Sequence, residues 1–191
     1  MSDNPTRSPI VFATVGTDQH PFDRLVRWLD RVAAGNADLQ CVVQFGTSSP
    51  PAFAAGIDYL NHDQLLGWID RAAVVITHGG PASIIQVRER HGRPIVIPRD
   101  PRRGEHVDRH QMDFAAMLDR MGAVSIASSS DELAELVDQH LATAPMPASV
   151  TPAARAAPSN RSAQVRLVST TAASRSAGSG SLWSPGATPM M

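Results

Sequence analysis

Short runs of apolar, mostly β-branched residues alternate along this chain with longer segments whose apolar residues recur at helical spacing. The runs PIVFATV (9–15), LQCVVQF (39–45) and AVVIT (73–77) contain no charged residue, which is typical of strands buried on both faces. Strands that alternate with helices of 10 to 15 residues favour a mostly parallel sheet with helices on both faces. The pattern therefore predicts a Rossmann-like α/β fold.

The same pattern gives approximate bounds for each element. The expected strands are 9–15, 39–45, 57–60, 73–77, 93–98 and 123–127. The expected helices are 22–34, 62–72, 81–90, 107–121 and 130–142, with Asn61 and Ser130 as N-caps. We expect residues 1–8 to be flexible, residues 9–144 to form one domain, and the Ala/Ser/Pro-rich residues 145–191 to be disordered.

Composition excludes several classes of protein. The chain has 191 residues, of which 42% are hydrophobic, and a net charge of −1, so one soluble domain with a tail is expected. No apolar run approaches the roughly 18 residues of a membrane span, and the first residues lack a signal-peptide pattern, which predicts a cytoplasmic protein. The only cysteine, Cys41, lies in an apolar strand and is expected to be a buried thiol.

The charged residues give no indication of a nucleic-acid partner. All 17 basic residues are arginines, which we interpret as a compositional bias of the genome. Four of them fall in 145–191, where there is no acidic residue, so the asymmetry is mild. A nucleic-acid-binding protein usually concentrates its basic residues on one face or one helix.

Three segments with unusual chemistry follow predicted strands. They are Gly16–His20, His78–Gly80 and Arg99–Gln111. In an open parallel sheet, ligands bind in the crevice beyond the carboxyl ends of the strands. We therefore expect the three loops to border one crevice.

The segment AVVITHGGPASI (73–84) joins a predicted strand to a predicted helix. Gly79 and Gly80 allow positive φ and a close approach of a ligand to the backbone. Pro81 suits the first helical position, and Ser83 offers a hydroxyl in the first turn. Exposed amides at a helix N-terminus make an anion site, whereas the alternative is a tight structural turn with His78 on the surface.

The other two loops exclude common sites. TVGTDQ lacks the pattern G-x-x-x-x-G-K-[ST] and is not G-x-G-x-x-G, which argues against a Walker ATPase and a dinucleotide dehydrogenase. The loop RDPRRGEHVDRHQ contains His106 and His110 but no H-E-x-x-H arrangement, so we expect no metal site there. Its alternative interpretation is a solvated loop.

Three motifs in register resemble a known family. VFATVGTDQHPFDRLVRWLD, AAVVITHGGPASI and GRPIVIPRDPRRGEHVDRHQMDFA resemble the V-G-T…P-F-D-R-L, H-x-G-x-x-[ST] and G-K-P…H-x-D-x-H-Q segments of the small family 28-type glycosyltransferases of exopolysaccharide and lipid-linked oligosaccharide synthesis. The resemblance runs from about residue 9 to 142. These proteins are similar to the C-terminal half of the lipid II N-acetylglucosaminyltransferase, so the fold implied is the C-terminal half of a GT-B enzyme.

The resemblance implies a donor site for a nucleotide sugar, usually a UDP-sugar, and no cofactor. Ser83 matches a position at the N-terminus of a helix in the family, and Gln86 matches the position of a ribose contact. The family has glutamate where this chain has Gln86, so a charge-assisted hydrogen bond to the ribose is lost. The other matching residues are Gly16 and Thr17 near the diphosphate, His78, Gly79 and Gly80 in the second motif, and His110 and Gln111 at the sugar ring.

The resemblance also implies a two-component enzyme. The expected ordered part leaves no room for the acceptor-binding domain of a GT-B enzyme, and the small relatives pair with a separate, membrane-anchored subunit that binds the acceptor. We expect such a partner, which would bring this chain to the inner face of the cell membrane. His20, beside the first loop, is the local candidate for a general base, and its alternative is a loop histidine without a catalytic role.

Two other functions fit part of the sequence. One is a nucleotide-sugar-binding regulatory module without catalysis, which Gln86 and the unusual tail favour. The other is a sugar-nucleotide epimerase, which would need a second domain in the same chain.

Overall fold

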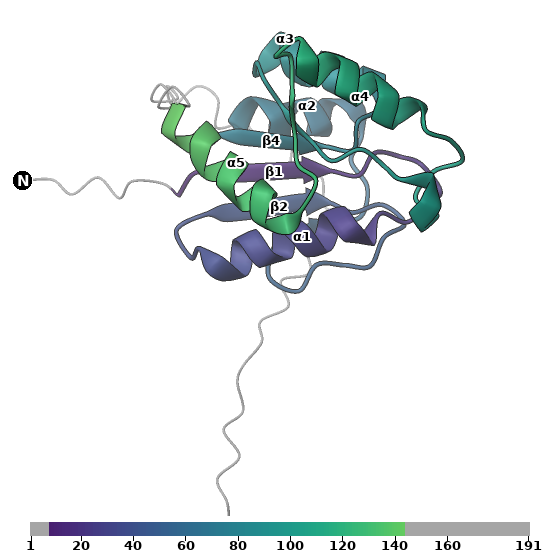
Figure 1. The fold of residues 1–191 in the computed structure, drawn as a ribbon. Coiled ribbons are helices and arrows are strands. Elements are labelled where there is room, and N and C mark those ends of the chain that lie inside the picture. The colour runs from purple at the N-terminus through teal and green to yellow at the C-terminus, as the bar shows by residue number, and fades with distance from the viewer. Residues whose placement is uncertain (1–7, 144–191) are drawn as a thin grey trace, which may run out of the picture.

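A computed structural model describes residues 8–143 as a six-stranded, all-parallel sheet with helices on both faces (Figure 1). The strands are β1 (Ile10–Thr14), β2 (Gln40–Gln44), β3 (Ala55–Ile57), β4 (Val74–Thr77), β5 (Ile95–Val96) and β6 (Ser125–Ile126). The helices are α1 (Asp23–Gly35), α2 (His62–Arg71), α3 (Pro81–Arg90), α4 (His110–Arg120) and α5 (Ser130–Thr143), with a 3₁₀ turn, η1, at Pro101–Arg103. The predicted α/β fold class is confirmed.

The two layers of helices follow from the alternation of side chains along the strands. Val11 and Ala13 of β1 point into a core shared with α1 and α5, whereas Phe12 points into the core beneath α2 and α3. A third cluster joins Ile84 of α3 to α4 and to the strands at the β5 edge. Since both faces are covered, the central strands are apolar except near their ends, where Thr14, Gln44 and Thr77 are buried polar residues at the carboxyl end.

Helix α2 begins where its sequence predicts. The Asn61 side chain accepts a hydrogen bond from the Gln64 backbone N–H, and the Gln64 side chain accepts one from the Asn61 N–H, which completes a capping box. The predicted cap of α5 is wrong by one residue. Ser129 rather than Ser130 accepts from the Glu132 N–H, because the Ser130 hydroxyl lies at the first helical position and bonds to Asp131 and Arg31.

The third strand also differs from its prediction. We expect it at 57–60, but β3 is Ala55–Ile57. Gly56 is the cause: a Cβ built there would lie 2.8 Å from Pro51 Cδ, so this strand position requires glycine for close packing, although glycine is usually rare in strands. The outer strands β5 and β6 are two residues each, shorter than the apolar runs that contain them.

Several expectations lie partly or wholly outside the described residues. The flexible N-terminus (1–8) is described only at residue 8, and the tail predicted to be disordered (145–191) is outside the structure. Within residues 8–143, no helix is long and apolar enough to cross a membrane. Cys41 is buried, and burial together with the charge of Asp30 raises the pKa of its thiol to about 11.

The strand order places a crevice between β1 and β4. The order is β3-β2-β1-β4-β5-β6, so the chain moves outward in one direction after β1 and in the other after β4. The loops that leave the carboxyl ends of these two neighbours turn to opposite faces, and the space between them is where open α/β sheets bind ligands.

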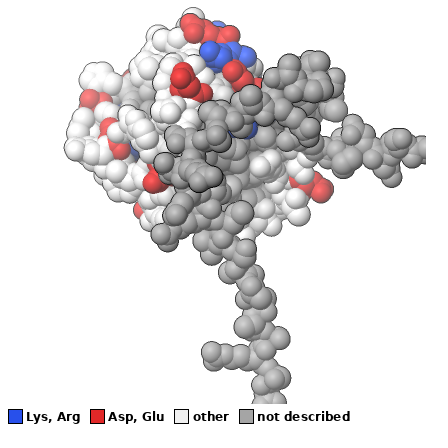
Figure 2. Space-filling view, turned by 180° about the vertical axis from the view of Figure 1, so that it is seen from behind, with Lys and Arg blue, Asp and Glu red and all other residues white. Residues whose placement is uncertain are grey.

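The back of the molecule carries charges of both signs. Among the coloured residues in Figure 2, acidic and basic side chains are dispersed over a largely uncharged surface. This visible part has no broad basic patch of the kind that holds nucleic acid.

Candidate functional site

A cleft of about 320 Å³ opens at the carboxyl ends of β1 and β4. Five residues predicted from the sequence line it: Gly16, Thr17, His78, Gly80 and Ser83. The remaining lining residues are Thr14, Gln44, Leu60, Leu65, Pro81 and Ala82. The first and second of the three predicted loops therefore meet around one cavity.

The floor of the cleft is a polar network that sequence reasoning missed. The Thr14 hydroxyl donates to Gln44 Oε1 at 2.7 Å and accepts from the Gly16 N–H at 3.1 Å. Gln44 Nε2 donates to the carbonyls of Gly16 and Asp58. Both side chains are buried, and together they fix the turn after β1, where Gly16 has φ +79°. A signal was available, because Gln44 is a polar residue at the end of a buried strand.

The His78 ring lies between two glycines. A Cβ on Gly16 would lie 2.5 Å from His78 Cε1, and a Cβ on Gly80 would lie 2.5 Å from His78 Nε2. Carbon atoms cannot approach so closely, so any side chain at either position displaces the ring. The observed position of the His78 ring therefore requires glycine at both Gly16 and Gly80. Gly79 has φ +92° and packs against Pro98 beneath the cleft rather than lining it.

Helix α3 presents its N-terminus to the cleft. Gly80 is the N-cap and has no side chain to accept from the first amides, and Pro81 occupies the first helical position. The backbone N–H groups of the first turn are therefore available to a ligand, and the helix dipole makes them favourable to an anion. Ser83, partly exposed at the third helical position, adds a hydroxyl.

His78 is neutral at physiological pH. Its side chain is 8% exposed, and burial together with the positive charge of Arg99 lowers its pKa to about 4. Its Nδ1 is buried and has no hydrogen-bond partner among the described residues. Because Nε2 faces the two glycines that line the cleft, this nitrogen is the one that can reach a ligand.

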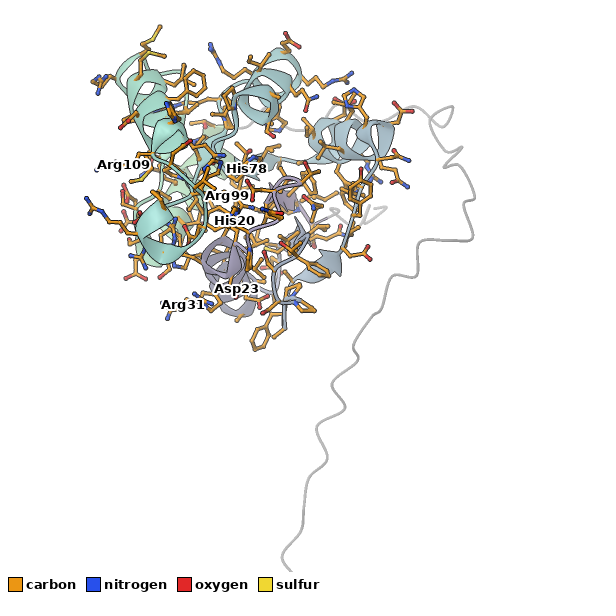
Figure 3. The ribbon with its side chains drawn as sticks, turned by 90° about the vertical axis from the view of Figure 1, so that its right-hand side faces the viewer. His20, Asp23, Arg31, His78, Arg99 and Arg109 are labelled. Carbon is orange, nitrogen blue, oxygen red and sulfur yellow. The ribbon has the colours of Figure 1, made fainter. Side chains whose placement is uncertain are left out.

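The arginine-rich third loop is held to the rest of the protein by the hydrogen bonds of its buried Arg99. Arg99 is fully buried at the carboxyl end of the sheet, beside the labelled His20 and His78 in Figure 3. Its guanidinium donates to the carbonyls of Val15, His20 and Glu105 at 2.7 to 2.8 Å, and it packs on the Phe22 ring. It therefore joins the first loop to the third and does not reach the cleft.

Glu105 anchors the same loop from the other side. Its carboxylate, 7% exposed, forms a bidentate pair with Arg24 of α1 at 2.7 and 2.9 Å and accepts from the Asp100 N–H. Arg24 also donates to the Pro98 carbonyl. Arg102 and Arg103, in contrast, are exposed on η1.

Histidines and carboxylates from the first and third loops meet beside Arg99. Asp18 Oδ1 lies 2.6 Å from His20 Nδ1, and Asp18 Oδ2 lies 3.6 Å from His106 Nε2. His110 is exposed and pairs with Asp108 at 3.0 Å. Asp18 and Asp108 show no arrangement with the histidines that would hold a metal ion within residues 8–143.

Besides Gly79, four predicted site residues lie outside the cleft lining. They are His20 in the first loop, Gln86 on α3, and His110 and Gln111 at the start of α4. Gln111 keeps its buried Oε1 without a hydrogen-bond partner in the described part of the chain. Their predicted contacts with the ribose, the sugar ring and the acceptor stay predictions.

Comparison with known proteins identifies a family model and several solved structures. Residues 10–166 match the model of the glycosyltransferase family 28 C-terminal domain. The glycotransferase of kitacinnamycin is similar, with a TM-score of 0.56 and 17% identity over 75% of this chain and 37% of that one. The calicheamicin glycosyltransferase CalG4 gives 0.56 and 12% over the same shares. No curated protein matches by sequence.

A third solved structure is also similar. MurG of Acinetobacter baumannii gives a TM-score of 0.50 and 17% identity over 73% of this chain and 42% of its own. This chain thus spans about two fifths of the solved proteins it matches. At these identities the likeness concerns the fold.

Proposed function

We propose a function from the premise that this chain belongs to the glycosyltransferase family 28 C-terminal domain family. The chain binds the UDP-sugar donor of a glycosyltransferase and positions it for transfer. The observation that carries the proposal is the cleft between β1 and β4, where the uncapped N-terminus of α3 meets the glycine turn after β1. No charged side chain lines this cleft. Its polar groups are backbone amides, the hydroxyls of Thr14, Thr17 and Ser83, the Gln44 side-chain amide and a neutral imidazole, and these suit a diphosphate bound without a metal.

The proposed placement of the donor follows from these groups. The diphosphate lies against the backbone N–H groups of Gly80, Ala82 and Ser83, with Gly16 and Thr17 on the opposite wall. His78 Nε2 and the Ser83 hydroxyl donate to phosphate oxygens. Gly79 packs on Pro98, which allows the backbone between β4 and α3 to turn close to the diphosphate. Gln86 contacts the ribose, and His110 and Gln111 contact the sugar ring.

The same groups support transfer as well as binding. When the bond between the anomeric carbon and the diphosphate breaks, negative charge grows on the leaving oxygen. Fixed dipoles aimed at the diphosphate stabilise that charge more than they stabilise the bound donor, which lowers the barrier. Because His78 has a pKa of about 4, it acts as a hydrogen-bond donor without carrying charge.

We further propose that a membrane-anchored partner binds the lipid-linked or polysaccharide acceptor and draws this chain to the inner face of the membrane. The large apolar side chains of Tyr59 and Val107 support this part, since they are 66% and 75% exposed on the loops that follow β3 and β5. Apolar residues exposed beside a cleft are common where a second protein covers it. Co-expression with a candidate partner, followed by co-purification, tests this part directly.

Calorimetric titration with UDP, a UDP-hexose, a UDP-N-acetylhexosamine and a GDP-hexose tests donor binding. We expect saturable binding of the uridine ligands at one site. A folded sample that binds none of the four would overturn the proposal, and tighter binding of the GDP-sugar would overturn the choice of nucleotide.

A further inference from the structure

The pair Asp18 and His20 is built like a general base held by its orienting carboxylate. Asp18 Oδ1 lies 2.6 Å from His20 Nδ1 and also accepts from the His20 backbone N–H at 2.8 Å. These two contacts fix both the main chain and the ring of His20 against one carboxylate oxygen. The ring keeps 30% of its side-chain surface exposed, and Nε2 has no hydrogen-bond partner among the described residues.

The carboxylate itself is held in place by the neighbouring loop. Its second oxygen, Oδ2, lies 3.6 Å from His106 Nε2, and the rings of His20 and His106 are 6.5 Å apart. Arg99 donates to the His20 carbonyl from below. Burial alone would raise the pKa of Asp18, but the hydrogen bonds from His20 and the charge of Arg99 bring it below its usual value, so the carboxylate stays ionised.

The position of this pair follows from the segments on either side. Gly16 and Thr17, two of the residues that line the cleft, directly precede Asp18. His106 belongs to the loop that leads into α4, which begins at His110. The pair therefore continues the segment that lines the cleft and contacts the loop that leads to the proposed sugar contacts.

We infer that this chain carries its own general base, with His20 Nε2 as the base and Asp18 as the residue that positions it, an inference that rests on the proposed donor site. In the step, the acceptor oxygen forms a bond to the anomeric carbon as the bond from that carbon to the diphosphate oxygen breaks. The proton of the acceptor hydroxyl passes to His20 Nε2, and the electron pair of the broken bond leaves with UDP. Asp18 accepts from Nδ1–H, which directs the free electron pair of the neutral ring to Nε2 and stabilises the imidazolium that forms.

A base on this chain predicts slow donor turnover without the natural acceptor, since water can take the acceptor's place. The experiment measures UDP release from the UDP-sugar that binds most tightly, together with the affinity for that donor, in the full chain. His20→Ala is expected to lower turnover about 100-fold with donor affinity within twofold, and added imidazole is expected to restore part of it.

Two further variants separate positioning from loop structure. Asp18→Asn keeps an oxygen for the His20 N–H but removes the charge, and we expect turnover to fall at least tenfold. Asp38→Asn, an exposed residue before β2 at the opposite end of the sheet, is the matched control and should behave as wild type.

The outcomes are distinguishable. If the wild type binds no donor, the proposed function fails. If it binds the donor but releases no UDP, or if His20→Ala turns over as the wild type does, the inference is overturned and the proposed donor site stands. A loss of turnover that imidazole does not restore, in a variant that binds the donor normally, would also overturn it and assign His20 to the structure of the loop.

Discussion

The loop between β4 and α3 and the loop between β5 and α4 border the same edge of the sheet but handle charge in opposite ways. The first, around His78–Ser83, has no charged side chain and offers backbone amides to the cleft. The second contains four arginines from Arg99 to Arg109, yet its buried charges, Arg99 and Glu105, bond to other parts of the protein. Under the proposed function the anion site is the part poor in charge, because backbone dipoles held by glycines can approach a ligand that a buried arginine cannot reach.

Removing the buried arginine is the strongest way to break this comparison. Arg99→Met leaves the carbonyls of Val15, His20 and Glu105 without their donor in a buried place, and we expect the free energy of unfolding to fall by about 3 to 5 kcal/mol. Urea denaturation measures it. A variant as stable as wild type that loses UDP affinity would show that Arg99 serves the ligand instead.

The pH dependence of stability tests the neutral state of His78. Its pKa in the folded protein, about 4, lies below the usual 6.5, so its stabilising effect is complete above pH 6.5 and is lost as the pH falls toward 4. Over this window we expect a loss of about 3 kcal/mol. Carboxylates such as Asp18 also lose stability in acid, so the measurement is the difference between the wild-type curve and that of His78→Asn. Parallel curves would contradict a buried neutral His78.

The close approach of Gly80 to the His78 ring can be tested by a double-mutant cycle. Gly80→Ala places a Cβ 2.5 Å from His78 Nε2, and we expect it to destabilise the wild type by about 1 to 3 kcal/mol. Since Gly80 has φ −65°, alanine meets no backbone strain there, and the change should cost below about 0.5 kcal/mol in a His78→Ala background. Equal costs in both backgrounds would show that the ring does not set the requirement.

The smallest expected effect concerns the hydroxyl at the start of α3. Ser83→Ala removes one donor to the diphosphate, and we expect UDP affinity to fall about tenfold while the melting temperature stays within about 2 °C. Thr143→Ala, an exposed hydroxyl at the far end of α5, is the control. Unchanged affinity in Ser83→Ala would move the diphosphate away from this turn.

The sequence predicts the turns that join strands to helices better than it predicts the contacts between loops. The segment AVVITHGGPASI predicts β4, the glycine turn and α3, because the conformation of each is determined by residues adjacent in the sequence. The partners of Arg99 lie 79 and 84 positions upstream, and Gly16 meets His78 across two strands. Such pairs depend on the strand order, which periodicity does not specify. Arg99 belongs to a loop that the sequence places at the crevice, and in the structure its side chain joins two loops instead.

Two other misreadings have local causes. The expected third strand begins at residue 57, just after Gly56, and the structure shows Gly56 inside β3, where Pro51 packs against the backbone. Thr14 and Gln44 fall within the apolar runs 9–15 and 39–45 and receive no role from the sequence, although they form the floor of the cleft. Polar residues at the carboxyl end of a buried strand are therefore worth treating as site candidates in this fold.

The central claim is that the charge-poor loop, rather than the arginine-rich one, holds the diphosphate. Amide chemical shifts of the isotopically labelled protein, recorded as UDP is added, test it most directly. The account predicts that the largest changes fall on Gly16, Thr17, Gly79, Gly80, Ala82 and Ser83, with small changes at Arg102 and Arg103. Changes centred on the amides of the loop from Arg99 to His110, with those of Gly79, Gly80, Ala82 and Ser83 unmoved, would contradict it.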